Sequence, residues 1–265
     1  MDWWPAYLAI GLVVGFLAGL LGIGGGMVMV PMLVFVFTAK GFAGEHLIHL
    51  AIATSLATIV FTSISSVRAH HRFGAVEWPI ARAMAPGIVA GAFGAALAAG
   101  LLPARPLVVC FSVVLFYTGT QILLEFKPRP GRKLPGAPGL FGAGALIGAL
   151  SSLAAVGGAF LTIPFLSWCN IPLKRAIGTA AANGFPIAIA GSVGYVIQGV
   201  RTHDHLPPGS FGYVYLPALG FIVVTSMFAA PFGARLMHRA PVRPIRIVFA
   251  LLLFAMGGRM LASQW

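Results

Sequence analysis

The chain has 265 residues, of which 59% are hydrophobic and 8% are charged, and its mean hydropathy is +0.95. A water-soluble domain carries about 25% charged residues, so this composition excludes a soluble globular domain. The formal net charge of +12 therefore predicts basic loops that face anionic lipid, with no nucleic acid as a partner.

Eight apolar segments follow one another along the chain, most of them near or above the roughly 20 residues that span a bilayer as a helix. They cover residues 6–38, 47–67, 79–101, 106–125, 140–169, 176–199, 212–234 and 244–262. We therefore predict an all-α integral membrane protein with several crossings. Trp3 and Trp4 at the start are typical of an interfacial anchor rather than of a removable signal peptide.

The first apolar segment contains a cluster of glycines, Gly22 and Gly24–Gly26, which is followed by Pro31. Each glycine costs a helix about 1 kcal/mol relative to alanine, so a continuous helix is not expected. We predict an unwound turn and then a short helix that starts near Met27. In a membrane such a break is tolerated only where it faces protein or a wet cavity. The alternative is a tight helix crossing without an unwound turn.

A second copy of this break lies in the fifth segment, where Gly157 and Gly158 match Gly24 and Gly25. Further matches link the later segments of the two halves, so we infer an internal duplication into two four-segment repeats. The inferred parts are a first membrane repeat at residues 1–126, a basic linker loop at 127–139 and a second membrane repeat at 140–265. Interrupted helices in matching positions of two halves indicate the binding site of a transporter.

The distribution of Lys and Arg distinguishes two arrangements of the eight segments. If all eight cross, the loops on the two sides carry nine and eight basic residues, which gives no positive-inside bias. If each glycine-broken segment is re-entrant and returns to the side it came from, the split is thirteen against four and the repeats are inverted. The count favours this second arrangement, with the linker loop in the cytoplasm and both ends of the chain outside. An arrangement in which the broken segments cross and another segment does not stays open.

Small residues spaced four apart precede both breaks, which predicts close packing against a neighbouring helix. They are Gly11, Gly15 and Gly19 in the first segment, and Gly144, Gly148 and Ser152 in the fifth.

The candidate binding site combines the two breaks with polar residues of the segment that follows each break. A helix that begins at an unwound turn directs free N–H groups and the positive end of its dipole at the membrane interior, where an anion can bind. Thr54 and Thr179 occupy matching positions, and Asn183 is a costly residue in a membrane. The candidate substrate-binding residues are Gly24, Gly25, Gly26, Met27, Thr54, Ser55, Gly157, Gly158, Ala159, Thr179 and Asn183.

Catalytic and metal-binding motifs are not found, so neither an enzyme nor a cofactor is expected. The sequence has no GxSxG, HExxH or CxxC motif, and Cys110 and Cys169 form no ligand cluster. The acidic residues lie near predicted interfaces, so a buried-acid proton relay is not expected. His70, His71, His203 and His205 are expected at loop edges, in contact with solvent.

The sequences GFLAGLLGIGGGMVMVPML at 15–33 and GALSSLAAVGGAFLTIPFL at 148–166 resemble the sulfite exporter TauE/SafE family, also called the domain-of-unknown-function 81 permeases. Residues 53–56 and 178–183 are similar to that family as well, and the resemblance spans nearly the whole chain. It implies a secondary transporter, often an exporter, of small sulfur-containing or carbon-acid anions such as sulfite and sulfoacetate, in a bacterial-type inner membrane. A passive anion channel and a membrane enzyme or assembly factor are the alternatives, and homo-oligomerisation stays open.

Overall fold

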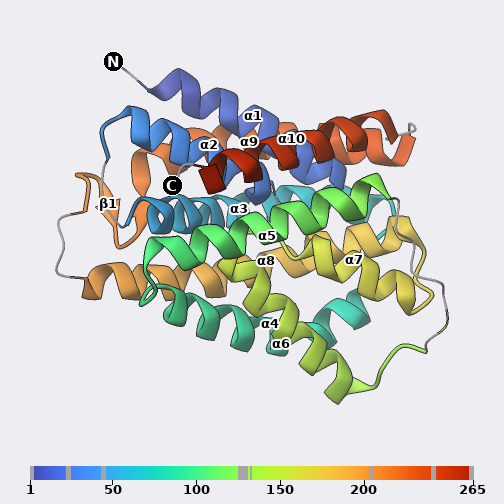
Figure 1. Cartoon of the computed structure of the whole chain (residues 1–265). Coiled ribbons are helices and arrows are strands. Elements are labelled where there is room, and N and C mark those ends of the chain that lie inside the picture. The colour runs from blue at the N-terminus through green and yellow to red at the C-terminus, as the bar shows by residue number, and fades with distance from the viewer. Residues whose placement is uncertain are drawn as a thin grey trace.

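The computed structural model describes residues 3–21, 25–42, 46–124, 131, 133–202, 206–239 and 243–262. These residues contain ten α helices and one two-stranded hairpin (Figure 1). The elements are α1 (Trp4–Leu21), α2 (Gly26–Ala39), α3 (Leu47–Arg72), α4 (Trp78–Ala99), α5 (Ala104–Leu123), α6 (Ala137–Leu153), α7 (Ala159–Trp168), α8 (Leu173–Arg201), β1 (Ser210–Phe211), β2 (Val214–Tyr215), α9 (Leu216–Arg239) and α10 (Arg243–Ala262).

The prediction of an all-α protein with several membrane-spanning helices is confirmed. Among the described residues, five helices, α3, α4, α5, α8 and α9, are long and apolar enough to cross a membrane. The 26 residues of α3 and the 29 of α8 correspond to about 39 and 43 Å, more than the roughly 30 Å of a hydrocarbon core. Two predicted segments are each divided into two helices, α1–α2 and α6–α7, at the glycine breaks. The number of crossings stays a prediction.

Several segment boundaries differ by a few residues from those expected. The predicted segment at 212–234 begins inside a β hairpin, and α9 starts only at Leu216. Gly209 and Gly212 have φ of 88° and 54°, and these left-handed values favour turns over a continuous helix. Helix α6 already begins at Ala137, so the last three residues expected in the linker are helical.

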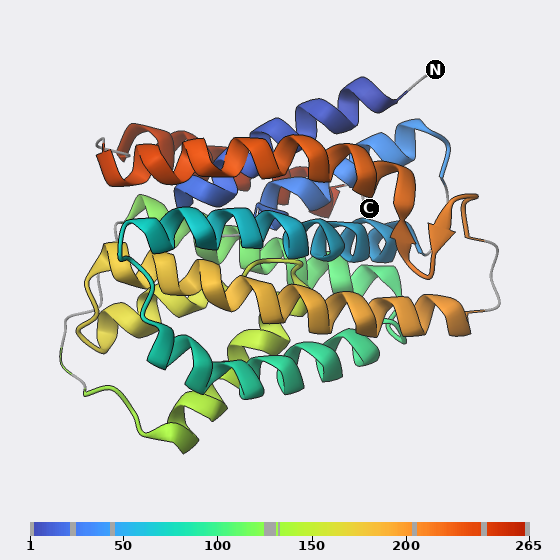
Figure 2. The same cartoon turned by 180° about the vertical axis from the view of Figure 1, so that it is seen from behind.

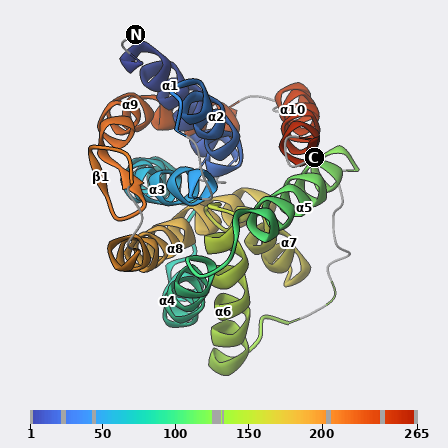
Figure 3. The same ribbon diagram turned by 60° about the vertical axis from the view of Figure 1, so that its left-hand side comes forward.

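Helices α3 and α8 pack against each other in the centre of the bundle (Figure 3). Helix α9 packs on α3 and carries α1 on another face, whereas α4 packs on α8 and carries α6. The short helices α2 and α7 contact α3 and α8, respectively, and α5 packs on α10. Seen from behind, α3, α8 and α4 run side by side along the long axis of the molecule (Figure 2).

The expected small-residue packing is confirmed for the glycines before both breaks. A Cβ on Gly15 of α1 would collide with the backbone of Ser226 in α9, and a Cβ on Gly148 of α6 would collide with the backbone of Ile88 in α4. Gly11, Gly19 and Gly144 approach the same partner helices as closely. Contact positions advance along both chains together, so α1 runs parallel to α9 and α6 runs parallel to α4.

Each glycine-broken segment forms a hairpin of two helices that returns to the end of the molecule from which it starts. Lys40, after α2, places its Nζ 5.8 Å from the ring centre of Tyr7 in the first turns of α1. Gly131, before α6, donates its N–H to the carbonyl of Trp168, the last residue of α7, at 3.5 Å. The two hairpins enter from opposite ends (Figure 1). We call these the Tyr215 end, with Tyr7, Lys40 and the β hairpin, and the Glu77 end, with Glu77, Trp168 and the start of α8.

Candidate functional site

The two glycine breaks have nearly identical backbone geometry. Gly25 has φ 76° and ψ −7°, and Gly158 has φ 78° and ψ −7°; each is the residue directly before a helix. A residue with a Cβ rarely adopts these left-handed values, which explains the glycine at both positions. Helix α2 begins at Gly26, so the predicted unwound turn followed by a short helix is confirmed. Gly24 lies outside the described residues.

Both short helices begin with backbone amides that have no acceptor within their own helix. Neither N-cap has a side-chain hydrogen bond. The carbonyl of Gly25 accepts hydrogen bonds from the N–H groups of Val28 and Met29 in α2. The carbonyl of Gly158 accepts them from the N–H groups of Leu161 and Thr162 in α7. The amides at 26–27 and 159–160 precede these and lie at the positive end of each helix dipole. Such an arrangement can hold an anion without a buried basic side chain.

The two breaks touch each other in the interior of the protein. A Cβ on Gly26, the first residue of α2, would overlap the carbonyl oxygen of Ala155, which belongs to the second break. Ala155 itself has φ 48°, an unusual value for a residue with a side chain. Residues 25–27 and 157–159 are all buried. One site can therefore include amides from both breaks.

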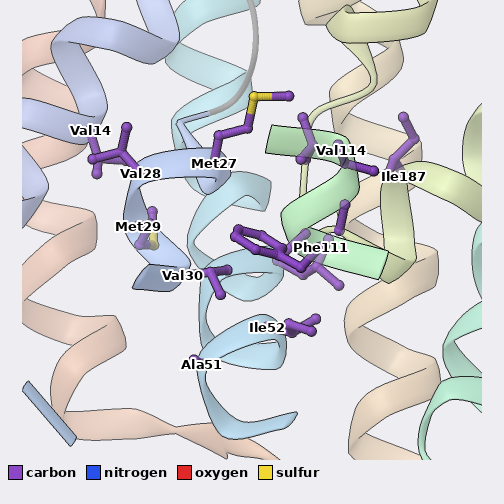
Figure 4. Close-up of a cluster of buried hydrophobic side chains, with 14 of the residues drawn as sticks. Val14, Met27, Val28, Met29, Val30, Ala51, Ile52, Phe111, Val114 and Ile187 are labelled. Carbon is purple, nitrogen blue, oxygen red and sulfur yellow. The ribbon is translucent and has the colours of Figure 1, made fainter. Parts of the chain in front are cut away.

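The surroundings of the first break are apolar. The Met27 side chain is fully buried in a cluster that also contains Phe111, Val114 and Ile187 (Figure 4). The Cδ1 atom of Ile187 is also the nearest neighbour of a Cβ placed on Gly158, at 2.5 Å. This cluster therefore lies between the two turns. Met27 can offer an anion its backbone N–H, and its thioether can contact only an apolar group.

Thr54 and Thr179 connect the two halves of the chain. The hydroxyl oxygen of Thr54 in α3 accepts a hydrogen bond from the backbone N–H of Tyr215, directly before α9, at 2.9 Å. The hydroxyl oxygen of Thr179 in α8 accepts one from the N–H of Glu77, directly before α4, also at 2.9 Å. Both threonines are fully buried. Their hydroxyls hold the start of another helix, and a role in binding stays a prediction.

Ser55 and Asn183 are buried and have unused hydrogen-bonding capacity. The Ser55 hydroxyl has no partner among the described residues. Asn183 is 1% exposed; its Nδ2 donates only to the sulfur of Met84 at 3.6 Å, and its Oδ1 has no partner in the described part of the chain. A buried amide without good partners is costly, and ligand binding would offset that cost.

Sequence reasoning missed Ser151 as a candidate. Its hydroxyl oxygen lies 3.4 Å from a Cβ placed on Gly158 and has no hydrogen-bond partner within the described ranges. On the other side of this turn, the Gly157 carbonyl oxygen lies 3.3 Å from a Cβ placed on Gly184, the neighbour of Asn183. The second turn therefore has the Ser151 hydroxyl beside it and contacts α8 at Gly184, next to Asn183 in the chain. The adjacent serines in the second copy of the break were the available signal.

The ion pair in the described part of the chain lies away from the two turns. Glu77 forms an ion pair with Arg175 at one end of the molecule, at 2.7 Å. In the described part of the chain, no group of three His, Cys, Asp or Glu side chains is placed to hold a metal. The expectation for His70 was wrong, because its ring is buried and its Nε2 lies 3.0 Å from the carbonyl of Gly19. The cause is that α3 continues to Arg72, which brings His70 against α1.

Long apolar helices around two interrupted helical segments, with both breaks buried, are typical of multi-pass membrane transporters. The chain belongs to the sulfite exporter TauE/SafE family, and the match covers residues 7–260. It is 36% identical over 248 residues to a probable membrane transporter protein of Haemophilus influenzae, with 93% of each chain covered. It is 24% identical to a probable membrane transporter protein of Methanocaldococcus jannaschii, over 96% of this chain and 93% of the relative. The probable membrane transporter protein YunE of Bacillus subtilis is 25% identical, with 94% of each chain covered.

No solved structure matches the chain significantly. Family membership and the names of the relatives point to a transporter rather than an enzyme.

Proposed function

We propose that the protein is a secondary transporter that exports a small sulfur-containing anion, such as sulfite or an organosulfonate. The observation that supports this most is the pair of buried left-handed glycines, with φ of 76° and 78°, that precede two short helices, together with the contact between the two breaks at Gly26 and Ala155. The oxygens of such an anion can accept several backbone N–H bonds at once. Each charge-assisted bond contributes about 1.5–3 kcal/mol, so a few are enough for micromolar binding.

In this proposal, each of the two turns binds a different part of the ligand. The second turn has the Ser151 hydroxyl beside it and contacts α8 next to Asn183, so it suits the charged sulfur–oxygen group. The first turn has the apolar cluster around Met27 and suits the carbon part of an organosulfonate. The small size of sulfite would leave that apolar contact unused. An organosulfonate is therefore the ligand that would use both surfaces.

An inverted repeat accounts for the contact pattern of the helices. Exchanging the first five helices with the last five turns the α1–α9 contact into α6–α4 and the α3–α9 contact into α8–α4, and both members of each pair are present. The two hairpins also enter from opposite ends. This pattern supports an arrangement in which α1–α2 and α6–α7 are re-entrant.

The distribution of Lys and Arg supports one orientation of the inverted arrangement in the membrane. Lys40, Arg105 and Arg201 lie at the Tyr215 end, and Arg259 in the last helix lies 5.0 Å from the ring of Phe35 near that end. The helix ends and loops at the opposite end carry the larger share of Lys and Arg. The positive-inside rule then places the Glu77 end in the cytoplasm, where it would face anionic lipids of a bacterial-type inner membrane.

Burial of the candidate residues favours a transporter over a passive channel. All ten described candidate residues, from Gly25 to Asn183, are buried. A conducting channel needs a continuous path to both sides, whereas a transporter passes through closed states. The channel stays the alternative that the flux experiment must exclude.

Binding and flux measurements test the proposal together. Purified protein is titrated with sulfite, thiosulfate, sulfoacetate, taurine and sulfate, and the same compounds are offered to proteoliposomes. We expect saturable uptake that is stimulated by unlabelled substrate on the opposite side. Flux that rises linearly with concentration and shows no exchange would indicate a channel, and a chemically altered product without a second compartment would indicate an enzyme.

A further inference from the structure

The hydrogen bonds that Thr54 and Thr179 accept are each accompanied by a second, side-chain contact. The two pairs of contacts lie at opposite ends of the protein. Arg175, in the first turn of α8, donates from its guanidinium to Oε1 of Glu77 at 2.7 Å. Lys40, directly after α2, donates from Nζ to the hydroxyl of Tyr215 at 2.8 Å. Each residue that precedes a helix is therefore held twice, at its backbone by a buried threonine and at its side chain by a basic residue.

We call these groups the Tyr215 latch (Thr54, Tyr215 and Lys40) and the Glu77 latch (Thr179, Glu77 and Arg175). We propose that they close the two routes from the membrane surfaces to the glycine turns, and that one latch opens at a time. This inference rests on the proposed transport function and adds the way in which access to the site is controlled.

The packing of the helices indicates what each latch would release. Helix α9 starts directly after Tyr215 and is joined tightly to α1 through Gly11, Gly15 and Gly19. Helix α4 starts after Glu77 and is joined as tightly to α6 through Gly144 and Gly148. Two helices with such close backbone contacts are expected to move together as one rigid body. Opening the Tyr215 latch would therefore let the α1–α9 pair separate from α3 at that end, and opening the Glu77 latch would let α4–α6 separate from α8.

The side-chain contacts of the latches are weak enough to break repeatedly. The Arg175 and Glu77 side chains are 56% and 27% exposed, and solvent-exposed ion pairs stabilise a structure very little. Lys40 lies 4.8 Å from the ring centre of Tyr215 and 5.1 Å from that of Phe42, where its charge meets neutral aromatic faces. Its partners in the described part of the chain include no carboxylate. Weak closure at both ends is what a transporter needs to exchange between two open states.

A cysteine reporter beside the second glycine turn tests the latches without any substrate. Ser151 is replaced by cysteine after Cys110 and Cys169 have been replaced by serine. A membrane-impermeant methanethiosulfonate reagent is then applied to right-side-out and to inside-out vesicles. We expect Arg175→Gln to raise the labelling rate from the face that carries the Glu77 end, and Lys40→Met to raise it from the opposite face. An exposed pair shifts an equilibrium about two- to five-fold, and labelling should rise by that factor.

Matched controls separate latch opening from loss of charge. Arg82→Gln removes an exposed basic residue near the start of α4, and Arg201→Gln removes one at the last residue of α8. Both should leave labelling as in the parent. The charge-swapped pair Glu77→Arg with Arg175→Glu should return the labelling rate toward the parent value, because it restores the ion pair.

Equal labelling increases from both faces, or no increase at all, would overturn the proposal and make the two groups static supports of the fold. A failure of sulfur-anion binding would overturn the proposed substrate and leave the labelling result unaffected, because no anion is present during labelling. If both increases appear on the faces opposite to those expected, the membrane orientation is reversed and the latches stand.

Discussion

Gly26 of α2 lies directly against the carbonyl oxygen of Ala155, so the two glycine breaks are in backbone contact across the two halves of the chain. Both residues in this contact are held in place. Gly26 starts a helix, and the N–H of Ala155 donates a hydrogen bond to the Ser152 carbonyl. We predict that Gly26→Ala destabilises the protein by about 1–3 kcal/mol, the usual cost of overpacking. Thermal unfolding in detergent would measure the loss.

A glycine in open space provides the control for this substitution. Gly142 in α6 has no heavy atom within 4 Å of a Cβ position. Gly142→Ala should leave the melting temperature unchanged or raise it slightly, because alanine is the better helix former. If both variants melt like the parent, the two breaks are not in close contact.

Gly25 and Gly158 share one backbone geometry, and their surroundings predict different responses to alanine. The Cβ at Gly158 would meet the Cδ1 end of Ile187, which can move, whereas the Cβ at Gly25 would lie 2.7 Å from the backbone oxygen of Val14, which cannot. Each variant also bears the left-handed strain of about 1–2 kcal/mol. We therefore expect Gly25→Ala to reduce yield and melting temperature more than Gly158→Ala does.

Anion binding adds a second readout to the same pair. Gly158→Ala protein that folds should bind the anion about tenfold more weakly, because a shifted turn misdirects at least one charge-assisted hydrogen bond. Isothermal titration with the best anion of the binding screen would measure this. Unchanged affinity in a well-folded Gly158→Ala protein would place the site away from the second turn.

The sequence was sufficient to predict the breaks because glycine clusters leave a strong local signal. A continuous helix through Gly22–Gly26 is unfavourable whatever surrounds it, and the second copy repeats the pattern at the matching positions. The glycine rows before each break were predictable for the same reason, since small residues at a spacing of four have few uses in a membrane helix other than close packing.

The roles of Thr54 and Thr179 could not be read from the sequence. Their hydroxyls meet the N–H groups of Tyr215 and Glu77, which are 161 and 102 residues away in the chain. Such pairing depends on which helix starts beside which, and local patterns carry no information on that. The unused hydrogen-bonding capacity of the buried Ser151 hydroxyl could not be predicted for the same reason, because it depends on the turn at Gly158 beside it.

The orientation of the chain in the membrane gives a prediction of its own. A cysteine at Lys133, in the linker at the Glu77 end, should react with an impermeant thiol reagent only in inside-out vesicles. A cysteine at Arg201, at the Tyr215 end, should react only in right-side-out vesicles. Reaction of both from the same side would contradict the inverted arrangement, because the α6–α7 segment would then cross the membrane as well as α8, or neither would cross.

Asn183 offers the sharpest separation of stability from binding. Its Oδ1 has no partner in the described residues and its Nδ2 has only the sulfur of Met84, so the side chain contributes little to the folded state. Replacing such a group with an apolar one of similar shape is nearly neutral or stabilising. Asn183→Leu should therefore melt at or above the parent temperature, while its affinity for the anion falls tenfold or more, which corresponds to about 1.4 kcal/mol or more.

The matched control for Asn183 is Gln198, another buried amide of the same helix that has a good partner. Its Nε2 donates to the carbonyl of Leu97 at 2.8 Å, close to the end of α4. Gln198→Leu leaves that carbonyl unpaired and should lower stability by about 1–3 kcal/mol with little change in anion affinity. Melting curves and anion titrations of the two variants, compared side by side, give opposite patterns if Asn183 binds the anion. If Asn183→Leu instead loses stability and keeps its affinity, the amide supports α4 through Met84 and takes no part in binding.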